Sequence, residues 1–170
     1  MRLPLRSPCV LLCLTLLLAP ACSTDDTDAP ADSFATAPDD PGLVHAESAH
    51  DVPTTVQRLT DALTQKGITV FNTIDHAEGA AGVGMDLRPT TLVIFGNPQV
   101  GTPLMQCSPT MGIDLPMKML VWRDADGTVR LTYVDPATLA ERHELGPECE
   151  EPVRTASTAL QNFASAATSE

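Results

Sequence analysis

Aromatic residues and cations are scarce in this chain. Phe, Trp and Tyr make up 4% of its 170 residues, and 10 Lys plus Arg stand against 22 Asp plus Glu, a formal net charge of −12. A nucleic-acid partner is not expected, because phosphate binding needs a basic face. The hydrophobic fraction is nevertheless 43%, enough for one aliphatic core and too high for wholesale disorder. The length fits one domain rather than two.

Catalytic signatures are absent as well. The chain has no G-x-S-x-G nucleophile motif, and Gly79, Gly82 and Gly84 form neither G-x-G-x-x-G nor a phosphate-binding loop with its lysine. Ser108 precedes a proline in a polar loop. The sequence therefore favours a protein without catalysis and without a cofactor, and leaves an enzyme as the alternative.

A long hydrophobic run is also missing. Val10–Ala19 forms an apolar run of ten, where a membrane-spanning helix needs about 20 residues. Because Arg2 and Arg6 precede it, the segment predicts a secretory signal peptide over residues 1–21. The Ala-Pro-Ala-Cys sequence that follows is similar to a bacterial lipobox, which predicts that Cys22 is lipidated. The alternative is an ordinary signal peptide cleaved nearby.

The next segment has no cation. Residues 23–41 contain six aspartates and one large apolar residue, Phe34. Such a segment buries too little apolar surface to offset its ordering entropy, so 22–42 is predicted to be a lipidated, disordered acidic tether. Ser23 stands where an aspartate would be the usual inner-membrane retention signal. We therefore expect a lipid-anchored protein of the bacterial cell envelope, at the outer membrane and facing the periplasm.

Hydrophobic periodicity from Gly42 onward predicts a mixed fold. Asp51 has the position of a helix N-cap, Asp135 of a second, and residues 124–127 form a hairpin turn. The predicted strands are 43–46, 68–74, 90–95, 116–122 and 128–134; the predicted helices are 52–66, a broken helix at 102–111, 136–142 and 153–167; and 77–85 is either a short helix or a loop. Because these strands and helices alternate irregularly and a hairpin is present, the sequence predicts a single compact α+β domain with a mostly antiparallel sheet packed by helices.

Several motifs within residues 43–145 resemble one bacterial family in order and spacing. They are Ile74-Asp75-His76-Ala77, Leu87-Arg88-Pro89-Thr90, Ile94-Phe95-Gly96-Asn97-Pro98, Gly101-Thr102-Pro103-Leu104-Met105, Asp114-Leu115-Pro116, Tyr133-Val134-Asp135-Pro136 and Arg142-His143. The family is domain of unknown function 302 (DUF302). The resemblance implies a compact α+β domain, a homodimer and no established activity. Residues 146–170, a linker and helix, depart from its pattern.

Polar residues of these motifs are candidates for a ligand-binding site. His76, Asn97 and Thr102 belong to three motifs beside glycine-rich turns, and we expect them to converge. A histidine is the natural general base near neutral pH, so an enzyme would have its site around His76. Asp75 does not form a dyad with His76, because adjacent strand residues point to opposite faces. A surface role for His76 is the alternative.

Sulfur-containing residues suggest a third function. Met105, Cys107, Met111, Met117 and Met119 fall within fifteen residues, and soft ligands select Cu(I). No M-x-x-M repeat is present and methionine commonly fills cores, so we expect core packing and no bound metal. A Cu(I)-binding module with Met, Cys and His ligands stays open as an alternative.

Two of the five cysteines remain available for a disulfide. Cys9 and Cys13 belong to the signal peptide and Cys22 to the lipid, so Cys107 and Cys149 remain. Two thiols in an oxidising compartment normally pair, which predicts a disulfide. The alternative is a buried Cys107 and a free Cys149. The sequence as a whole predicts an envelope lipoprotein whose domain binds a small ligand or a protein partner.

Overall fold

The computed structural model describes residues 42–170, so the expectations for the signal peptide, Cys22 and the tether lie outside the described residues. Its elements in chain order are β1 (Leu43–Glu47), α1 (Val52–Gln65), β2 (Thr69–Asp75), α2 (His76–Ala81), β3 (Thr90–Gly96), α3 (Pro98–Cys107), the 3-10 helix η1 (Pro109–Ile113), β4 (Met117–Arg123), β5 (Val129–Val134), α4 (Pro136–Arg142), the 3-10 helix η2 (Pro147–Cys149) and α5 (Glu150–Thr168).

The strands form one antiparallel sheet in the order β1-β5-β4-β3-β2. The predicted turn closes the β4–β5 hairpin, where the Asp124 carboxylate accepts the main-chain N–H groups of Asp126 and Thr128. Gly127 supplies the positive φ, 88°, that the turn requires. The α+β class with an antiparallel sheet is confirmed.

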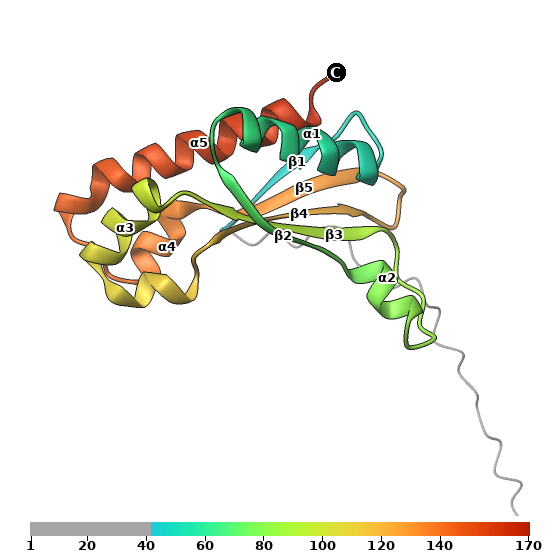
Figure 1. Ribbon diagram of the computed structural model, residues 1–170, viewed down its shortest axis with the longest axis horizontal. Coiled ribbons are helices and arrows are strands. Elements are labelled where there is room, and N and C mark those ends of the chain that lie inside the picture. Colours follow the sequence, from blue (N-terminus) through green and yellow to red (C-terminus); the bar gives the residue numbers. More distant parts are fainter. Residues whose placement is uncertain (1–41) are drawn as a thin grey trace, which may run out of the picture. The chain divides into compact units, whose positions relative to one another are not determined.

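Helices α1 and α5 lie together on one face of the sheet (Figure 1). Helix α1 begins where predicted, because Asp51 accepts the N–H of Thr54, and it buries Leu59 and Leu63 completely. Helix α5 adds Phe163, whose ring meets that of Phe95 edge-on with centroids 6.4 Å apart. The main core therefore lies between this helix pair and the sheet.

A second, smaller core lies at one end of the sheet. It consists of the buried residues Leu104, Met111, Leu139 and Ala156, from α3, η1, α4 and α5. The candidate site is built on this cluster. No helix within residues 42–170 is long and apolar enough to cross a membrane.

Two helices differ from the predicted bounds. Asn97-Pro98 ends β3 as expected, but the helix expected over 102–111 begins earlier: Asn97 caps α3 by accepting the N–H of Gln99, and Pro98 occupies its first turn. Pro109 then begins η1. Helix α5 begins at Glu150, three residues before the predicted 153.

Candidate functional site

An apolar pocket of about 300 Å³ opens where β3 ends and α3 begins. Helix α3 forms one wall, the segment from η1 to β4 forms another, and α5 contributes Ala156. The lining residues are Phe71, Gly96, Asn97, Pro98, Val100, Gly101, Thr102, Leu104, Met105, Gly112, Leu115, Pro116, Met117 and Ala156. None of these side chains carries a charge.

Phe71 reaches the pocket because of a β-bulge. In the β2–β3 pairing Val70 lies opposite Phe95 and Asn72 opposite Ile94, so Phe71 is an extra residue without a partner. Its side chain is 56% exposed at the pocket. Sequence reasoning missed this residue, because a bulge depends on the pairing of two strands and leaves no mark on one strand alone.

Two of the three predicted site residues line the pocket. The Asn97 side-chain oxygen is engaged in capping α3, and its amide NH₂ has no hydrogen-bond partner among residues 42–170. Thr102 is exposed on α3, and its hydroxyl is likewise unpartnered in the described part of the chain. The Asn97 amide and the Thr102 hydroxyl are therefore the side-chain groups of this otherwise apolar pocket that are free to form hydrogen bonds with a ligand.

His76 does not join them, which corrects the expected convergence. It is exposed at the start of α2, directly after Asp75, which pairs with Thr91 at the beginning of β3. Asn97 follows the other end of β3, about 20 Å away at 3.4 Å per strand residue. Figure 1 shows α2 and α3 at opposite ends of the sheet.

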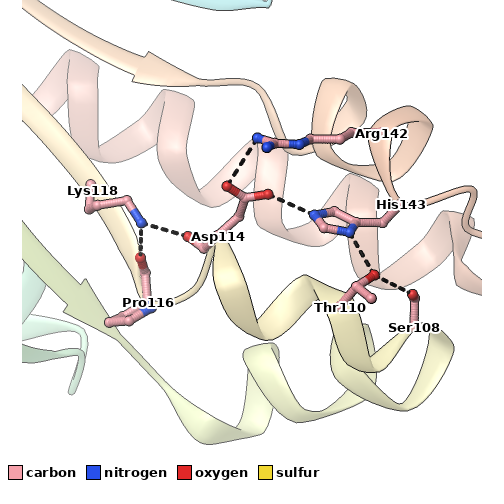
Figure 2. Close-up of polar contacts among 7 residues, drawn as sticks. All are labelled: Ser108, Thr110, Asp114, Pro116, Lys118, Arg142 and His143. Atoms are coloured by element: carbon pink, nitrogen blue, oxygen red, sulfur yellow. Dashed lines mark hydrogen bonds and ion pairs between the residues drawn. The ribbon is translucent and has the colours of Figure 1, made fainter.

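A polar network lies behind the pocket wall (Figure 2). Asp114 joins His143 Nε2 through Oδ2 at 2.7 Å and accepts from Arg142 through Oδ1 at 3.3 Å. His143 Nδ1 meets the Thr110 hydroxyl at 2.8 Å, and that hydroxyl meets the Ser108 hydroxyl at 2.9 Å. The His143 side chain is only 6% exposed.

The network fixes the segment that forms the wall. Leu115, Pro116 and Met117 follow Asp114 directly and line the pocket, and the Lys118 ammonium donates to the main-chain oxygens of Asp114 and Pro116. A carboxylate, imidazole and hydroxyl in series could relay a proton, but the pocket lining includes neither Thr110 nor Ser108. In the described structure the polar network therefore holds η1 and β4 against α4.

His143 has two structural roles. It caps the end of α4 through its main chain, and its ring is directed at Asp114. The sequence offered one indication that Asp114 and His143 act together, namely that both belong to the family-like motifs.

A disulfide joins Cys107 to Cys149 in the structure, with the Cα atoms 6.3 Å apart. It ties the end of α3 to the turn before α5. A bonded sulfur is no thiolate ligand, and Met111 and Met119 are buried in the two separate cores. Within residues 42–170, no group of three His, Cys, Asp or Glu side chains could hold a metal ion.

The five-stranded sheet, its helices and the pocket beside α3 together form a small α+β domain, whose family is known. The family described as "Domain of unknown function DUF302" matches residues 44–163, and the chain belongs to this family. The match continues past Leu145, where we expected the family-like domain to end, through most of α5. This agrees with the packing, because α5 completes both cores.

Two curated relatives are channel proteins by name. "Fluoride-specific ion channel FluC 1" of Brucella suis biovar 1 (strain 1330) is 50% identical over 107 residues, which is 63% of this chain and 42% of that protein. "Fluoride-specific ion channel FluC 2" of Brucella melitensis biotype 1 is 50% identical over 107 residues, 63% of this chain and 40% of that protein. The chain thus spans about two fifths of their length.

A solved structure has the same fold. The uncharacterized conserved DUF302 protein from Bacillus stearothermophilus superposes with a TM-score of 0.68 at 20% identity, covering 74% of this chain and 98% of that one. The match covers nearly all of that protein, so the two chains share the whole of its fold.

Proposed function

We propose that this domain is a non-catalytic binding module that takes a small, uncharged, mostly apolar ligand in the pocket beside α3. One observation carries the proposal: the pocket is lined entirely by uncharged and mostly apolar residues. Its volume, about 300 Å³, lies at the lower limit of small-molecule sites. A charged ligand would lose its hydration there without gaining an ionic partner.

The same lining supports binding without catalysis as the proposal. A hydrolytic or acid–base site needs a nucleophile beside a base, or a titratable group within reach of substrate. Thr102 has the only hydroxyl in the lining, and no histidine, carboxylate or amine lies among the lining residues to activate it. Its hydroxyl and the Asn97 amide can each form one hydrogen bond with a ligand.

A neutral fluorescent probe tests the proposal. N-phenyl-1-naphthylamine should bind saturably and brighten, and Gly101→Leu should abolish the signal, because a Cβ at Gly101 meets only Leu115, at 3.6 Å, and a longer side chain would fill the pocket. Gly79→Leu is the matched control, since Gly79 is a helical glycine with nothing within 4 Å of its Cβ position. Equal binding by Gly101→Leu would refute the pocket as the site.

The envelope anchor is part of the proposal. The lipobox-like sequence ending at Cys22 and the acidic segment after it support a lipoprotein, and an oxidising compartment would maintain the Cys107–Cys149 bond. Cys22→Ser should abolish incorporation of labelled palmitate and release the protein into the soluble fraction. Unchanged membrane association would rule the lipid anchor out.

Fluoride binding by this domain is a second candidate. It is favoured by the 50% identity to proteins named fluoride-specific ion channels. Titration with sodium fluoride, followed by ¹⁹F NMR, should then give a saturable shift that sodium chloride does not reproduce. Fluoride signals that are identical with and without protein would remove this candidate.

A further inference from the structure

Three large hydrophobic side chains are exposed around the mouth of the pocket. They are Phe71, Met105 and Ile113, of which Ile113 is 77% exposed, and we call them the rim. Phe71 and Met105 line the pocket, and the Met105 sulfur lies 3.6 Å from the Cβ position of Gly112, the residue before Ile113. Exposed apolar side chains that gather beside one pocket indicate a surface that contacts another apolar body.

The segments that carry the rim contain almost no charge. Residues 69–74 have no charged side chain, and residues 96–117 have one, Asp114, whose carboxylate is held in the polar network of Figure 2. The next cation along the chain, Lys118, donates to two main-chain oxygens. The chain as a whole carries −12, so its excess charge lies elsewhere. The rim therefore suits an uncharged apolar surface better than a charged macromolecule.

The chain enters the described domain at the same end of the sheet as the rim. Leu43 pairs with Val134, and the Gly42 carbonyl accepts the N–H of Asp135, so β1 starts where β5 ends. Strands β3 and β5 both run antiparallel to β4, so their ends lie on one edge of the sheet. Figure 1 shows α4, which follows β5, beside α3 at that end. An anchor on the residues before Gly42 would thus hold the pocket end nearest to it.

We infer that the rim docks on a lipid bilayer and that the pocket takes one acyl chain of a membrane lipid. The acyl-chain site rests on the binding pocket proposed above and names the class of its ligand. A hydrocarbon chain matches the uncharged lining, and the Asn97 amide and the Thr102 hydroxyl can donate to ester oxygens. A lipid on Cys22, twenty residues before Gly42, would keep the domain within about 70 Å of the bilayer, and the rim would turn the pocket toward it.

A water-soluble lipid separates this inference from the proposed function. In the chain with Cys22→Ser, which has no covalent lipid to compete, dihexanoylphosphatidylcholine below its micelle-forming concentration should displace N-phenyl-1-naphthylamine. Glycerophosphocholine, the same headgroup without acyl chains, should not. Probe that binds and then stays bound in the presence of the lipid would overturn the acyl-chain site and leave the binding pocket intact. A chain that never binds the probe would refute the proposed function and the acyl-chain site with it.

Two matched reporters test docking on the bilayer. Ile113→Trp places an indole on the rim, and Val83→Trp places one after α2, at the opposite end of the sheet and at a similarly exposed residue, 74%. With phosphatidylcholine vesicles whose acyl chains are brominated, the emission added by Ile113→Trp should shift to the blue and be quenched. The emission added by Val83→Trp should do neither, although the residues before Gly42 bring both reporters equally close to a vesicle.

Three results of this experiment would overturn the docking. Equal quenching of the two reporters would show that the domain has no preferred end at the bilayer, and quenching of neither would show that it does not dock. A rim reporter that is already shifted to the blue without vesicles, and that bromine does not quench, would show that protein covers the rim instead.

Charge substitutions measure how much the rim contributes. Added to the Ile113→Trp reporter, Met105→Glu should raise the lipid concentration for half-maximal quenching about tenfold, because it removes one large apolar side chain from the contact. Met85→Glu, at an exposed methionine after α2, is the matched control and should leave that concentration unchanged. Equal effects of the two would overturn the assigned surface.

The headgroup charge gives a further test. Vesicles of phosphatidylglycerol should quench the Ile113→Trp reporter more weakly than vesicles of phosphatidylcholine, since the chain and that surface are both negative. Raising the salt concentration should reduce the difference. Stronger quenching by phosphatidylglycerol would show docking through cations and would overturn the inference.

Discussion

The ring of Phe71 lies directly against Gly96: a Cβ placed on Gly96 would come within 3.2 Å of Phe71 Cε2. That distance is tighter than ordinary carbon contacts, so the absence of a side chain at Gly96 is what lets the aromatic ring close one side of the pocket.

Enlarging Gly96 should weaken ligand binding. Gly96→Val would push the Phe71 ring off the pocket, and a loss of roughly 50 Å² of apolar contact is worth about 1.3 kcal/mol. That corresponds to about a tenfold higher Kd for N-phenyl-1-naphthylamine. Phe71→Ala should give the same loss, and the double variant should be no weaker than either single one. Additive losses would show that the two residues act separately.

Removing the Asp114 carboxylate should loosen the pocket wall. Asp114→Ala leaves the largely buried His143 without its Nε2 partner, which should lower the free energy of unfolding by about 2 kcal/mol. Arg142→Ala is the control: its ion pair with Asp114 is longer and its side chain is 64% exposed, so a change below about 0.5 kcal/mol is expected. Urea titration measures both; equal effects would contradict the assigned network.

The Cys107–Cys149 bond should form in protein isolated under oxidising conditions and should stabilise the fold. In the chain-entropy model, closing a loop of about 43 residues contributes roughly 4 kcal/mol. Cys107→Ser/Cys149→Ser should therefore unfold at a clearly lower urea concentration than the oxidised chain. Non-reducing peptide mapping checks the bond itself, and two alkylatable thiols in the folded, oxidised sample would refute it.

The hairpin carboxylate Asp124 should make stability fall in acid. Burial opposes its ionisation, but hydrogen bonds from Arg130 and from the N–H groups of Thr128 and Asp126 outweigh it and lower the pKa of Asp124 below its ordinary value. Because the folded pKa is the lower one, its stabilisation is complete above about pH 4 and is lost as pH falls through the folded value.

Melting curves recorded from pH 7 to pH 2 test whether Asp124 makes the fold less stable as the pH falls. Asp124→Asn should melt lower at pH 7 and should lose less stability on acidification than the parent chain. Asp126→Asn, in the same turn but exposed, should follow the parent profile. An Asp124→Asn profile parallel to that of the parent would show that Asp124 does not contribute to the acid loss.

Local signals in the sequence predicted much of the fold. Asp51 and Asp135 cap their helices, and the Asp124–Gly127 turn joins two strands, because each of these features is decided by residues a few positions apart. The Asn97-Pro98 pair ends β3 as its pattern indicates, but the start of α3 was predicted four residues too late, because the local pattern does not show that the same two residues also begin a helix.

The site was harder to predict because its parts are distant in sequence. Asp114 and His143 are 29 positions apart, and Phe71 and Gly96 meet only through strand pairing. Asn97 and Thr102, chosen as polar residues of motifs beside glycine-rich turns, both lie in the segment that lines the pocket. His76 was wrongly grouped with them, because the antiparallel course of β2 and β3 separates the ends that lead to α2 and α3.

The bulge at Phe71 makes β2 one residue longer than its pairing with β3 requires. Deleting that residue would leave Val70 opposite Phe95 and bring Asn72 next to it opposite Ile94, a continuous ladder with every other pair unchanged. The aromatic wall can therefore be gained or lost through a single-codon insertion or deletion. Within this fold, a chain whose β2 carries the extra residue has the aromatic pocket wall, and a chain whose β2 is one residue shorter lacks it.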